Sequence, residues 1–296
     1  MSSPIATAPG CLWDVKATLG EGALWDAARR QVWFVDIKGR RIHRCSEDGG
    51  DRRSWDAPSQ VGFVVPLEGG GMVCGLEDGL YRFVEQTGAG RLDFAPLVKV
   101  EADLPGNRFN DGHVDAKGRL WFGSMDNGES APSGTLYRFD GALVAAMDAG
   151  YIITNGPALS PDGRTLYHTD TLAKRIFAFH LTPNGALESK RSFIELDGPG
   201  HPDGMAVDAE GHLWVATFGG WRIDRFDPQG VKVGEVRFPC ANITKLAFGG
   251  DDLRTVYVTT ARKGLSEEQL REQPLAGGLF TFRSRTPGLA QHLLRI

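Results

Sequence analysis

The chain has 296 residues, of which 41% are hydrophobic and 24% are charged, close to the averages of globular proteins. This composition excludes a disordered chain, and a net charge of −4 without any basic run argues against nucleic acid as a partner. No apolar run reaches the ~18 residues that a membrane span needs, so we expect no membrane partner either. Length alone allows either one large all-β domain or two smaller domains.

The start of the chain and its cysteines indicate the compartment. The first ten residues, MSSPIATAPG, lack the basic and apolar regions of a signal peptide, and we expect residues 1–10 to be flexible. The four cysteines form no C-x-x-C pair and are too few for a disulfide scaffold; they are Cys11, Cys45, Cys74 and Cys240. We therefore expect reduced thiols in a cytoplasmic protein that is a monomer or a weak homo-oligomer.

Short apolar or alternating stretches, typical of β-strands, recur along the chain at 32–37, 72–76, 119–125, 165–170, 212–217 and 255–260. Each stretch has a bulky anchor residue at the same place, and these anchors are Trp33, Val73, Trp121, Tyr167, Trp214 and Tyr257. Their spacings of 40, 48, 46, 47 and 43 residues lie in the range of propeller blades. The repeat predicts six similar units.

Turn residues separate the strands within each unit. The 39 glycines and 16 prolines are spread along the chain, and hairpin signatures precede several anchors at 114–118, 160–163 and 207–211. About four strands fit into each unit. We therefore predict one all-β domain over residues 1–296, a six-bladed β-propeller with four-stranded blades around a central channel. A pair of β-sandwiches would match the number of strands but not the regular repeat.

One helix interrupts the last unit. In LSEEQL at 265–270, Ser266 is suited to the N-cap, Gln269 follows three residues later, and Leu265 and Leu270 occupy the staple positions. Pro274 ends the segment. This pattern predicts a short helix at the rim of the last blade.

Polar residues recur in phase with the repeat, 10 to 12 residues before the anchors: Glu21, Asn110, Asp111, Asn155 and Asp203. The innermost strands of a propeller converge on its axis, so these oxygens should converge as well. Two carboxylates and an amide form a hard-oxygen site suited to one divalent ion, Ca²⁺, Mg²⁺ or Mn²⁺, with Zn²⁺ and Fe²⁺ as alternatives. Asx-Gly pairs often only form turns, but agreement of phase across four units favours a site.

Longer matches then reveal a resemblance. The chain resembles the senescence marker protein/gluconolactonase/regucalcin family of metal-dependent propeller lactonases, and within it the bacterial sugar-acid lactonases of the xylonolactonase and arabinolactonase kind. The matching stretches are LGEGALW (19–25), NRFNDGHVDAKGRLWFGSM (107–125), ITNGPALSPDGRTLYHTD (153–170), HPDGMAVDAEGHLWVA (201–216), FGGDDLRTVYVTTARKGL (248–265) and PLAGGLF (274–280). Together they span nearly the whole chain.

The resemblance implies a metal centre. The family's Glu, Asn and Asp ligands fall on Glu21, Asn155 and Asp203, three of the residues in phase with the repeat. Asp203 is also the candidate catalytic residue, because a carboxylate beside the metal can take a proton from the attacking water. Asp111 matches a family position for which we expect a supporting or turn role.

The resemblance also implies a substrate site. Arg108 and Asn110 match the family's substrate-binding pair, Glu129 matches a further acidic residue in the following loop, and Lys263 is a candidate rim residue. The implied reaction is metal-dependent hydrolysis of a sugar aldonolactone, such as xylono-, arabino-, galactono- or glucono-lactone, in sugar catabolism. The alternatives are an esterase or phosphotriesterase on the same centre and a calcium-binding scaffold without catalysis.

Overall fold

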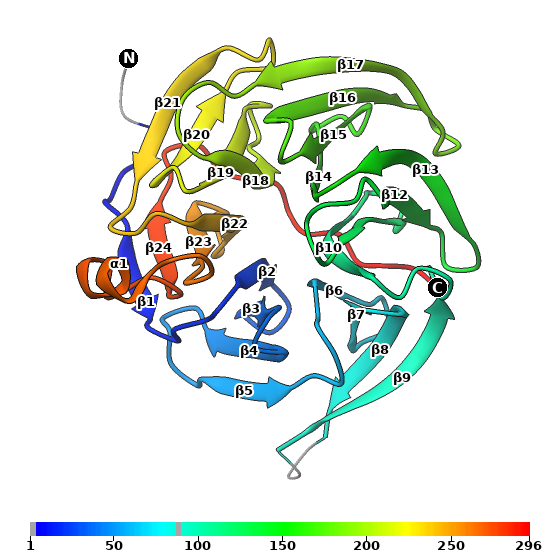
Figure 1. Ribbon diagram of the computed structural model, residues 1–296, viewed down its shortest axis with the longest axis horizontal. Helices are drawn as coiled ribbons and strands as arrows, with labels where there is room; N and C mark the ends of the chain where they lie inside the picture. Colours follow the sequence, from blue (N-terminus) through cyan, green and yellow to red (C-terminus); the bar gives the residue numbers. More distant parts are fainter. Residues whose placement is uncertain (1–3, 87–89) are drawn as a thin grey trace.

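The computed structural model describes residues 4–86 and 90–296, and its strands form six four-stranded antiparallel sheets arranged in a ring (Figure 1). The predicted six-bladed β-propeller is confirmed. The innermost strands are β2, β6, β10, β14, β18 and β22, and each contacts its neighbours around the ring.

Three blades come from the first half of the chain, and in each the strands run outward from the axis in chain order. The first blade consists of β2 (Gly20–Asp26), β3 (Gln31–Asp36), β4 (Arg41–Ser46) and β5 (Arg53–Asp56). The second consists of β6 (Phe63–Pro66), β7 (Met72–Leu76), β8 (Gly79–Glu85) and β9 (Leu92–Lys99). The third consists of β10 (Asn107–Val114), β11 (Leu120–Asp126), β12 (Gly134–Phe139) and β13 (Val144–Tyr151).

The second half of the chain supplies the other three blades. The fourth consists of β14 (Thr154–Leu159), β15 (Thr165–Asp170), β16 (Arg175–Leu181) and β17 (Leu187–Glu195). The fifth consists of β18 (His201–Val207), β19 (Leu213–Phe218), β20 (Arg222–Phe226) and β21 (Lys232–Arg237). The sixth combines β22 (Ile243–Gly249), β23 (Thr255–Thr260) and β24 (Leu279–Arg283) with β1 (Gly10–Trp13), so the two ends of the chain close the ring.

The helix α1 (Glu267–Glu272) lies between β23 and β24, as the sequence predicts. Ser266 is its N-cap, and the Ser266 and Gln269 side chains form a capping box with the backbone. Within the described part of the chain, no helix is both long and apolar enough to cross a membrane. The four cysteines are all free.

The anchor residues lie on the second strand of each blade and form the cores between blades. Trp121 and Trp214 are fully buried, and each indole Nε1 donates a 2.9 Å hydrogen bond to an aspartate of the preceding V-D-A-x-G turn, Asp115 or Asp208. The same aspartates accept backbone N–H groups of their own turns. The turn signature therefore fixes the hairpin and orients the anchor.

Five of the six inner strands are irregular near their first residues, and in four of them, β2, β10, β14 and β18, the predicted polar residues lie at the irregularity. The register shifts after Glu21 in β2, Phe109 in β10, Asn155 in β14, Pro202 in β18 and Ile243 in β22. Such bulges twist a strand and redirect a side chain. Glycines with positive φ allow two of them, Gly22 at 59° and Gly156 at 76°. The X-Gly pairs in the sequence are therefore bulges that face the axis.

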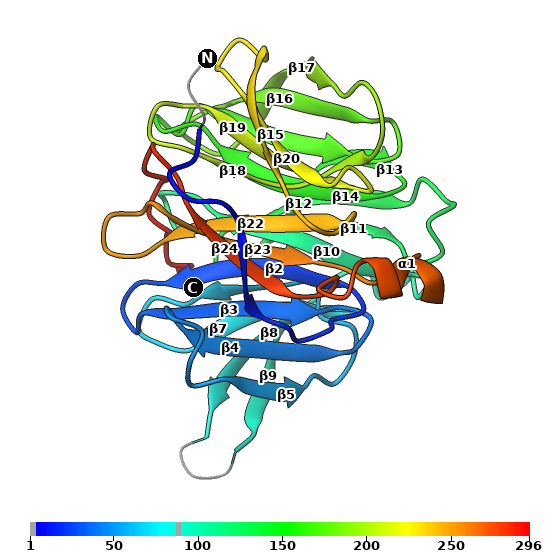
Figure 2. The same cartoon turned by 90° about the vertical axis from the view of Figure 1, so that its left-hand side faces the viewer.

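The last residues of the chain cross one face of the ring. Leu294 is fully buried and its N–H donates to Pro66, while the N–H of Arg295 donates to Gly118. In the edge view, α1 protrudes from the opposite face (Figure 2). We call the face with α1 the front and the face with the C-terminal segment the rear.

Candidate functional site

All six residues that the sequence assigns to metal and substrate line one cavity of about 160 Å³, the front cavity: Glu21, Arg108, Asn110, Glu129, Asn155 and Asp203. They come from the first residues of β2, β10, β14 and β18 and from the loop after β11. Lys263, which follows β23, lines the same cavity. Residues far apart in the sequence are thus brought together because equivalent strand starts meet at the axis.

The three proposed metal ligands are buried. Glu21, Asn155 and Asp203 are 3%, 3% and 5% exposed. Among the described residues, Glu21 accepts a hydrogen bond only from the N–H of Gly22, at 3.1 Å, and the Asp203 carboxylate accepts none. Their carboxylate oxygens are therefore left with free lone pairs inside the molecule.

The charged forms of these carboxylates are disfavoured. Burial, and then the charge of Asp111, raises the pKa of Glu21 to about 8. Burial, and then the charges of Glu21 and Asp111, raises the pKa of Asp203 well above its usual value. A nearby cation would stabilise both ionised forms.

The donor set fits a hard divalent cation. Two poorly compensated carboxylates and the amide oxygen of Asn155 are the oxygen ligands that such ions prefer. In the part of the chain that the structure covers, no three His, Cys, Asp or Glu side chains gather closely enough to hold an ion by themselves. The candidate centre therefore depends on Asn155 and on water for its remaining ligands.

Arg108 and Asn110 form a hydrogen-bonded chain beside the ligands. Arg108 Nη1 donates to Oδ1 of Asn110 at 2.6 Å, and Asn110 Nδ2 donates to Oδ1 of Asn155 at 2.8 Å. Asn155 Nδ2 in turn donates to Oγ1 of Thr171 at 2.9 Å. This series of hydrogen bonds fixes the side chain of Asn155, the proposed amide ligand. Asn110 takes part through both its Oδ1 and its Nδ2.

Arg108 retains capacity for a substrate. Its side chain is buried at 2% exposed and its Nη1 donates to Phe109 and Asn110, while among the described residues its Nη2 has no hydrogen-bond partner. Burial lowers the pKa of Arg108 to about 10, against the attraction of Glu129, so the guanidinium remains charged at neutral pH. A buried cation with an unpaired donor favours an oxygen-rich ligand.

Glu129 and Lys263 meet at the rim of the front cavity. The Lys263 Nζ forms an ion pair with Oε1 of Glu129, and each side chain is 31% exposed. Asp126 holds the Glu129 loop by accepting backbone N–H bonds from Ser130 and Ala131 at 2.8 Å. The pair links two loops of different blades across the rim.

Asp111 does not line the front cavity. Its Oδ2 lies 2.6 Å from the Nζ of Lys245, and Asp111 and Lys245 both line a second cavity on the rear side. The sequence analysis missed Lys245, although Lys245 precedes the anchor Tyr257 by 12 residues and so falls in the same phase as Glu21. It also missed the apolar wall formed by Met125, Leu172 and Phe218, because only polar residues were compared.

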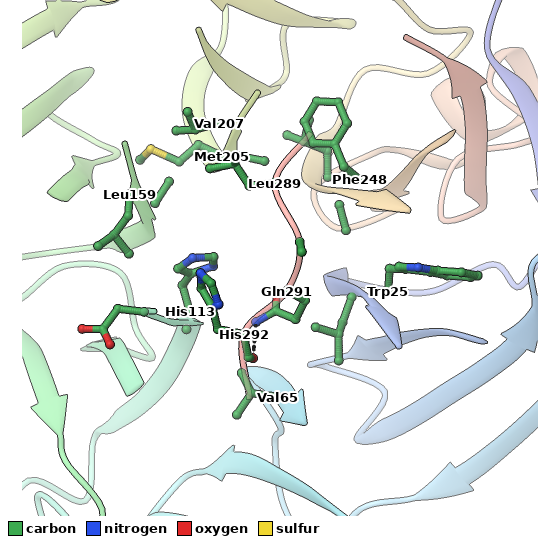
Figure 3. Close-up of a pocket in the computed structure, with 18 of the residues that line it drawn as sticks. Trp25, Val65, His113, Leu159, Met205, Val207, Phe248, Leu289, Gln291 and His292 are labelled. Atoms are coloured by element: carbon green, nitrogen blue, oxygen red, sulfur yellow. Dashed lines mark hydrogen bonds between the residues drawn. The ribbon is translucent and has the colours of Figure 1, made fainter. Parts of the chain in front are cut away.

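The rear cavity is the larger one, at about 290 Å³ (Figure 3). Leu159, Met205, Val207 and Phe248 supply apolar walls from the later residues of the inner strands. The C-terminal segment passes across it with Leu289, Gln291 and His292, and His113 lies beside His292. Its polar lining includes Asp111, Lys245 and Asp115, but none of the residues that the sequence assigns to metal or substrate.

Comparisons with known proteins show the family of the chain. The SMP-30/Gluconolactonase/LRE-like region matches residues 19–262. L-arabinolactonase of Azospirillum brasilense is 37% identical over 285 residues, which cover 94% of this chain and 93% of that protein. 6-deoxy-6-sulfogluconolactonase of Pseudomonas putida is 33% identical over 287 residues, which cover 96% and 97%.

The fold has a close counterpart among solved structures. A calcium-binding protein, regucalcin, from Agrobacterium tumefaciens matches with a TM-score of 0.93 and 29% identity, and both chains are covered completely. The relatives named as lactonases agree with the expected enzyme class, a hydrolase of carboxylic ester bonds. The resemblance inferred from the sequence is confirmed, and the chain belongs to the SMP-30/gluconolactonase/LRE-like family.

Proposed function

We propose that the protein hydrolyses a five- or six-carbon sugar aldonolactone to the aldonic acid, with one divalent metal ion in the front cavity. The observation that carries this proposal is the convergence of Glu21, Asn155 and Asp203 beside Arg108 in one cavity. The named arabinolactonase and sulfogluconolactonase among the relatives support the substrate class. Free cysteines are consistent with the cytoplasm as the setting.

The proposed ligands are Glu21, Asn155 and Asp203. A divalent ion bound there would supply Lewis-acid polarisation of the lactone carbonyl and charge for the developing oxyanion. The oxygen ligands favour Ca²⁺, Mg²⁺ or Mn²⁺, and a relative described as calcium-binding supports a divalent ion of this kind.

The chain's own residues position the lactone and move the proton. Arg108 donates from its Nη2 to hydroxyls or the ring oxygen, and Glu129 accepts from a sugar hydroxyl. Asp203 accepts a proton from the attacking water, whose oxygen bonds to the carbonyl carbon. The ring C–O bond then breaks, and the proton passes to the departing ring oxygen, which becomes the hydroxyl of the product.

Initial rates of acid release at constant pH test this function. The panel contains xylono-, arabino-, galactono- and glucono-lactone, an unsubstituted lactone and a phosphotriester, each corrected for spontaneous hydrolysis. We expect the highest kcat/KM for a sugar lactone, since a site with unpaired donors loses binding when the hydroxyls are missing. A higher value for the phosphotriester would assign the centre to a different ester, and no hydrolysis with any metal would favour the scaffold.

A further inference from the structure

One lysine crosses the axis of the propeller behind the candidate metal centre. Lys245 lies on β22 and Asp111 lies on β10, and these two strands face each other across the ring of inner strands. The Lys245 Nζ nevertheless lies 2.6 Å from Oδ2 of Asp111. The lysine side chain therefore spans the channel.

The surrounding backbone is shaped for this crossing. A Cβ on Gly204 would lie 2.4 Å from Cδ of Lys245, so the absence of a side chain there makes room for the lysine stem. The Lys245 and Asp111 side chains are only 8% and 2% exposed. Asp111 also accepts the N–H groups of Gly112 at 2.8 Å and Gly156 at 3.1 Å. Both carboxylate oxygens of Asp111 are therefore satisfied and fixed.

The charges near the axis explain why such a pair is needed. Asp111 is the third carboxylate here, and it lies close enough to repel the charges of Glu21 and Asp203. Lys245 attracts all three. Burying a carboxylate without a partner costs free energy. A third negative charge beside the two carboxylate ligands would also increase the attraction for a cation.

We propose that Lys245 is a positioning residue of the metal centre, an internal cation that cancels the charge of Asp111 and keeps this carboxylate out of the ligand set. Asp111 in turn shields the metal ion from the lysine charge. The two residues line the rear cavity and are absent from the lining of the front cavity, so the ion pair also forms the partition between them. This inference rests on the proposed metal centre.

A double-mutant cycle of Asp111 and Lys245, in which the affinity for a metal ion is measured, tests the inference. The variants are Asp111→Asn, Lys245→Met and the double variant, each compared with the wild type by calorimetric titration with Mn²⁺. Asp111→Asn leaves the lysine charge uncompensated, and we expect at least ~10-fold weaker binding from this repulsion. The double variant restores neutrality, so it should bind more tightly than Asp111→Asn alone. Lys245→Met leaves the Asp111 charge uncompensated, so it should bind Mn²⁺ more tightly than the wild type.

The outcomes separate the inference from the proposed function. If the wild type binds no divalent ion, the metal centre itself is wrong, and the role of Lys245 falls with it. If the wild type binds one ion but the double variant binds no better than Asp111→Asn, the pair is only structural and the inference is overturned while the centre stands. Should Asp111→Asn fail to fold, Lys245→Met decides the matter alone, because binding that is unchanged or weaker than in the wild type contradicts the proposal.

Discussion

The front and rear cavities are built from the same inner strands but differ in chemistry. The front cavity is lined by the first residues of the inner strands and by rim loops, which supply three carboxylates, two asparagines and a buried arginine. The rear cavity receives the later residues of the strands and is larger, about 290 Å³ against about 160 Å³, but its walls are mainly apolar. We therefore assign the proposed site by its convergent polar groups, among them the Glu21 and Asp203 carboxylates with their raised pKa values, and not by cavity size.

The difference follows from the position of the bulges. Each lies near the start of an inner strand, where it turns a polar side chain toward the axis, as with Glu21 and Asn155. Beyond the bulge the strand alternates regularly, and residues such as Met205 and Val207 join the core between blades. One strand thus supplies function at its front end and stability at its rear end.

Substitution of the proposed metal ligands in the front cavity should cause the largest loss of catalytic activity. We expect Glu21→Gln, Asn155→Ala and Asp203→Asn each to lower kcat at least ~10²-fold, as is seen when an oxyanion stabiliser is lost. The matched control is Met205→Leu in the rear cavity, a volume-conserving change that should leave kcat unchanged. Steady-state kinetics on samples with equal near-UV circular dichroism measures both. Near wild-type turnover in Asp203→Asn would show that the base and ligand are wrongly assigned.

A large substitution in the rear cavity should lower the stability of the protein and leave its activity unchanged. Phe248 is 6% exposed and packs edge-on against Trp214 with ring centroids 5.7 Å apart. Phe248→Ala should lower the free energy of unfolding by about 3 kcal/mol, because it removes core contacts. The activity of the folded enzyme should persist. Chemical denaturation together with kinetics tests this, and a loss of kcat as large as that of Asp203→Asn would contradict the separation of the two ends.

Substitution of Arg108 should lower the activity on sugar lactones more than the activity on a lactone without hydroxyls. We expect Arg108→Ala to lower kcat/KM for polyhydroxylated lactones roughly 10- to 100-fold, the range for a hydrogen bond to a charged group. The unsubstituted lactone should lose less, since it has no hydroxyls for Arg108 to bind. The ratio of the two kcat/KM values is therefore the measurement. An equal loss for both substrates would mean that Arg108 supports the centre without recognising the sugar.

The smallest predicted effect concerns His113 at the rear. Burial lowers the pKa of His113 to about 3, so the folded protein resists a proton that the unfolded chain takes up near pH 6.5. Stability should therefore fall as the pH drops from about 6.5 toward 3, by less than ~1.4 kcal/mol per pH unit because the ring is partly open to the cavity. His113→Gln should flatten this decline and leave kcat unchanged. Denaturation midpoints between pH 7 and pH 4 provide the test, and parallel curves would refute it.

The sequence predicted the fold because the anchors and turns repeat. Trp121 and Trp214 follow V-D-A-x-G turns at the same distance, and the structure shows the reason, an indole bonded to the turn aspartate. Three of the proposed site residues, Glu21, Asn155 and Asp203, could be singled out because an X-Gly pair such as Asn155-Gly156 marks a bulge at a fixed position of a blade, whereas Arg108 and Glu129 were indicated by the family resemblance. Local chemistry of this kind is readable from one chain.

Other features depend on distance across the ring and could not be read in the same way. The Lys245–Asp111 ion pair joins residues 134 positions apart on opposite strands, and no local motif encodes that contact. The hydrogen bonds from Asn110 to Thr154 and Asn155 also depend on the closed ring, and so do those that hold the C-terminal segment across the rear face. One local signal for Lys245 does exist in the sequence. This lysine precedes the anchor Tyr257 by 12 residues, the same spacing that separates Glu21 from Trp33.

The central claim is that one divalent ion, held at the front by Glu21, Asn155 and Asp203, is needed for lactone hydrolysis. The most direct measurement titrates Mn²⁺ into verified metal-free protein while the hydrolysis of an arabino-lactone is followed in the same sample. We predict that activity starts near the spontaneous rate, rises in proportion to added ion and levels off at one equivalent per chain, with no such rise for Glu21→Gln. Full activity in the metal-free protein would contradict the account.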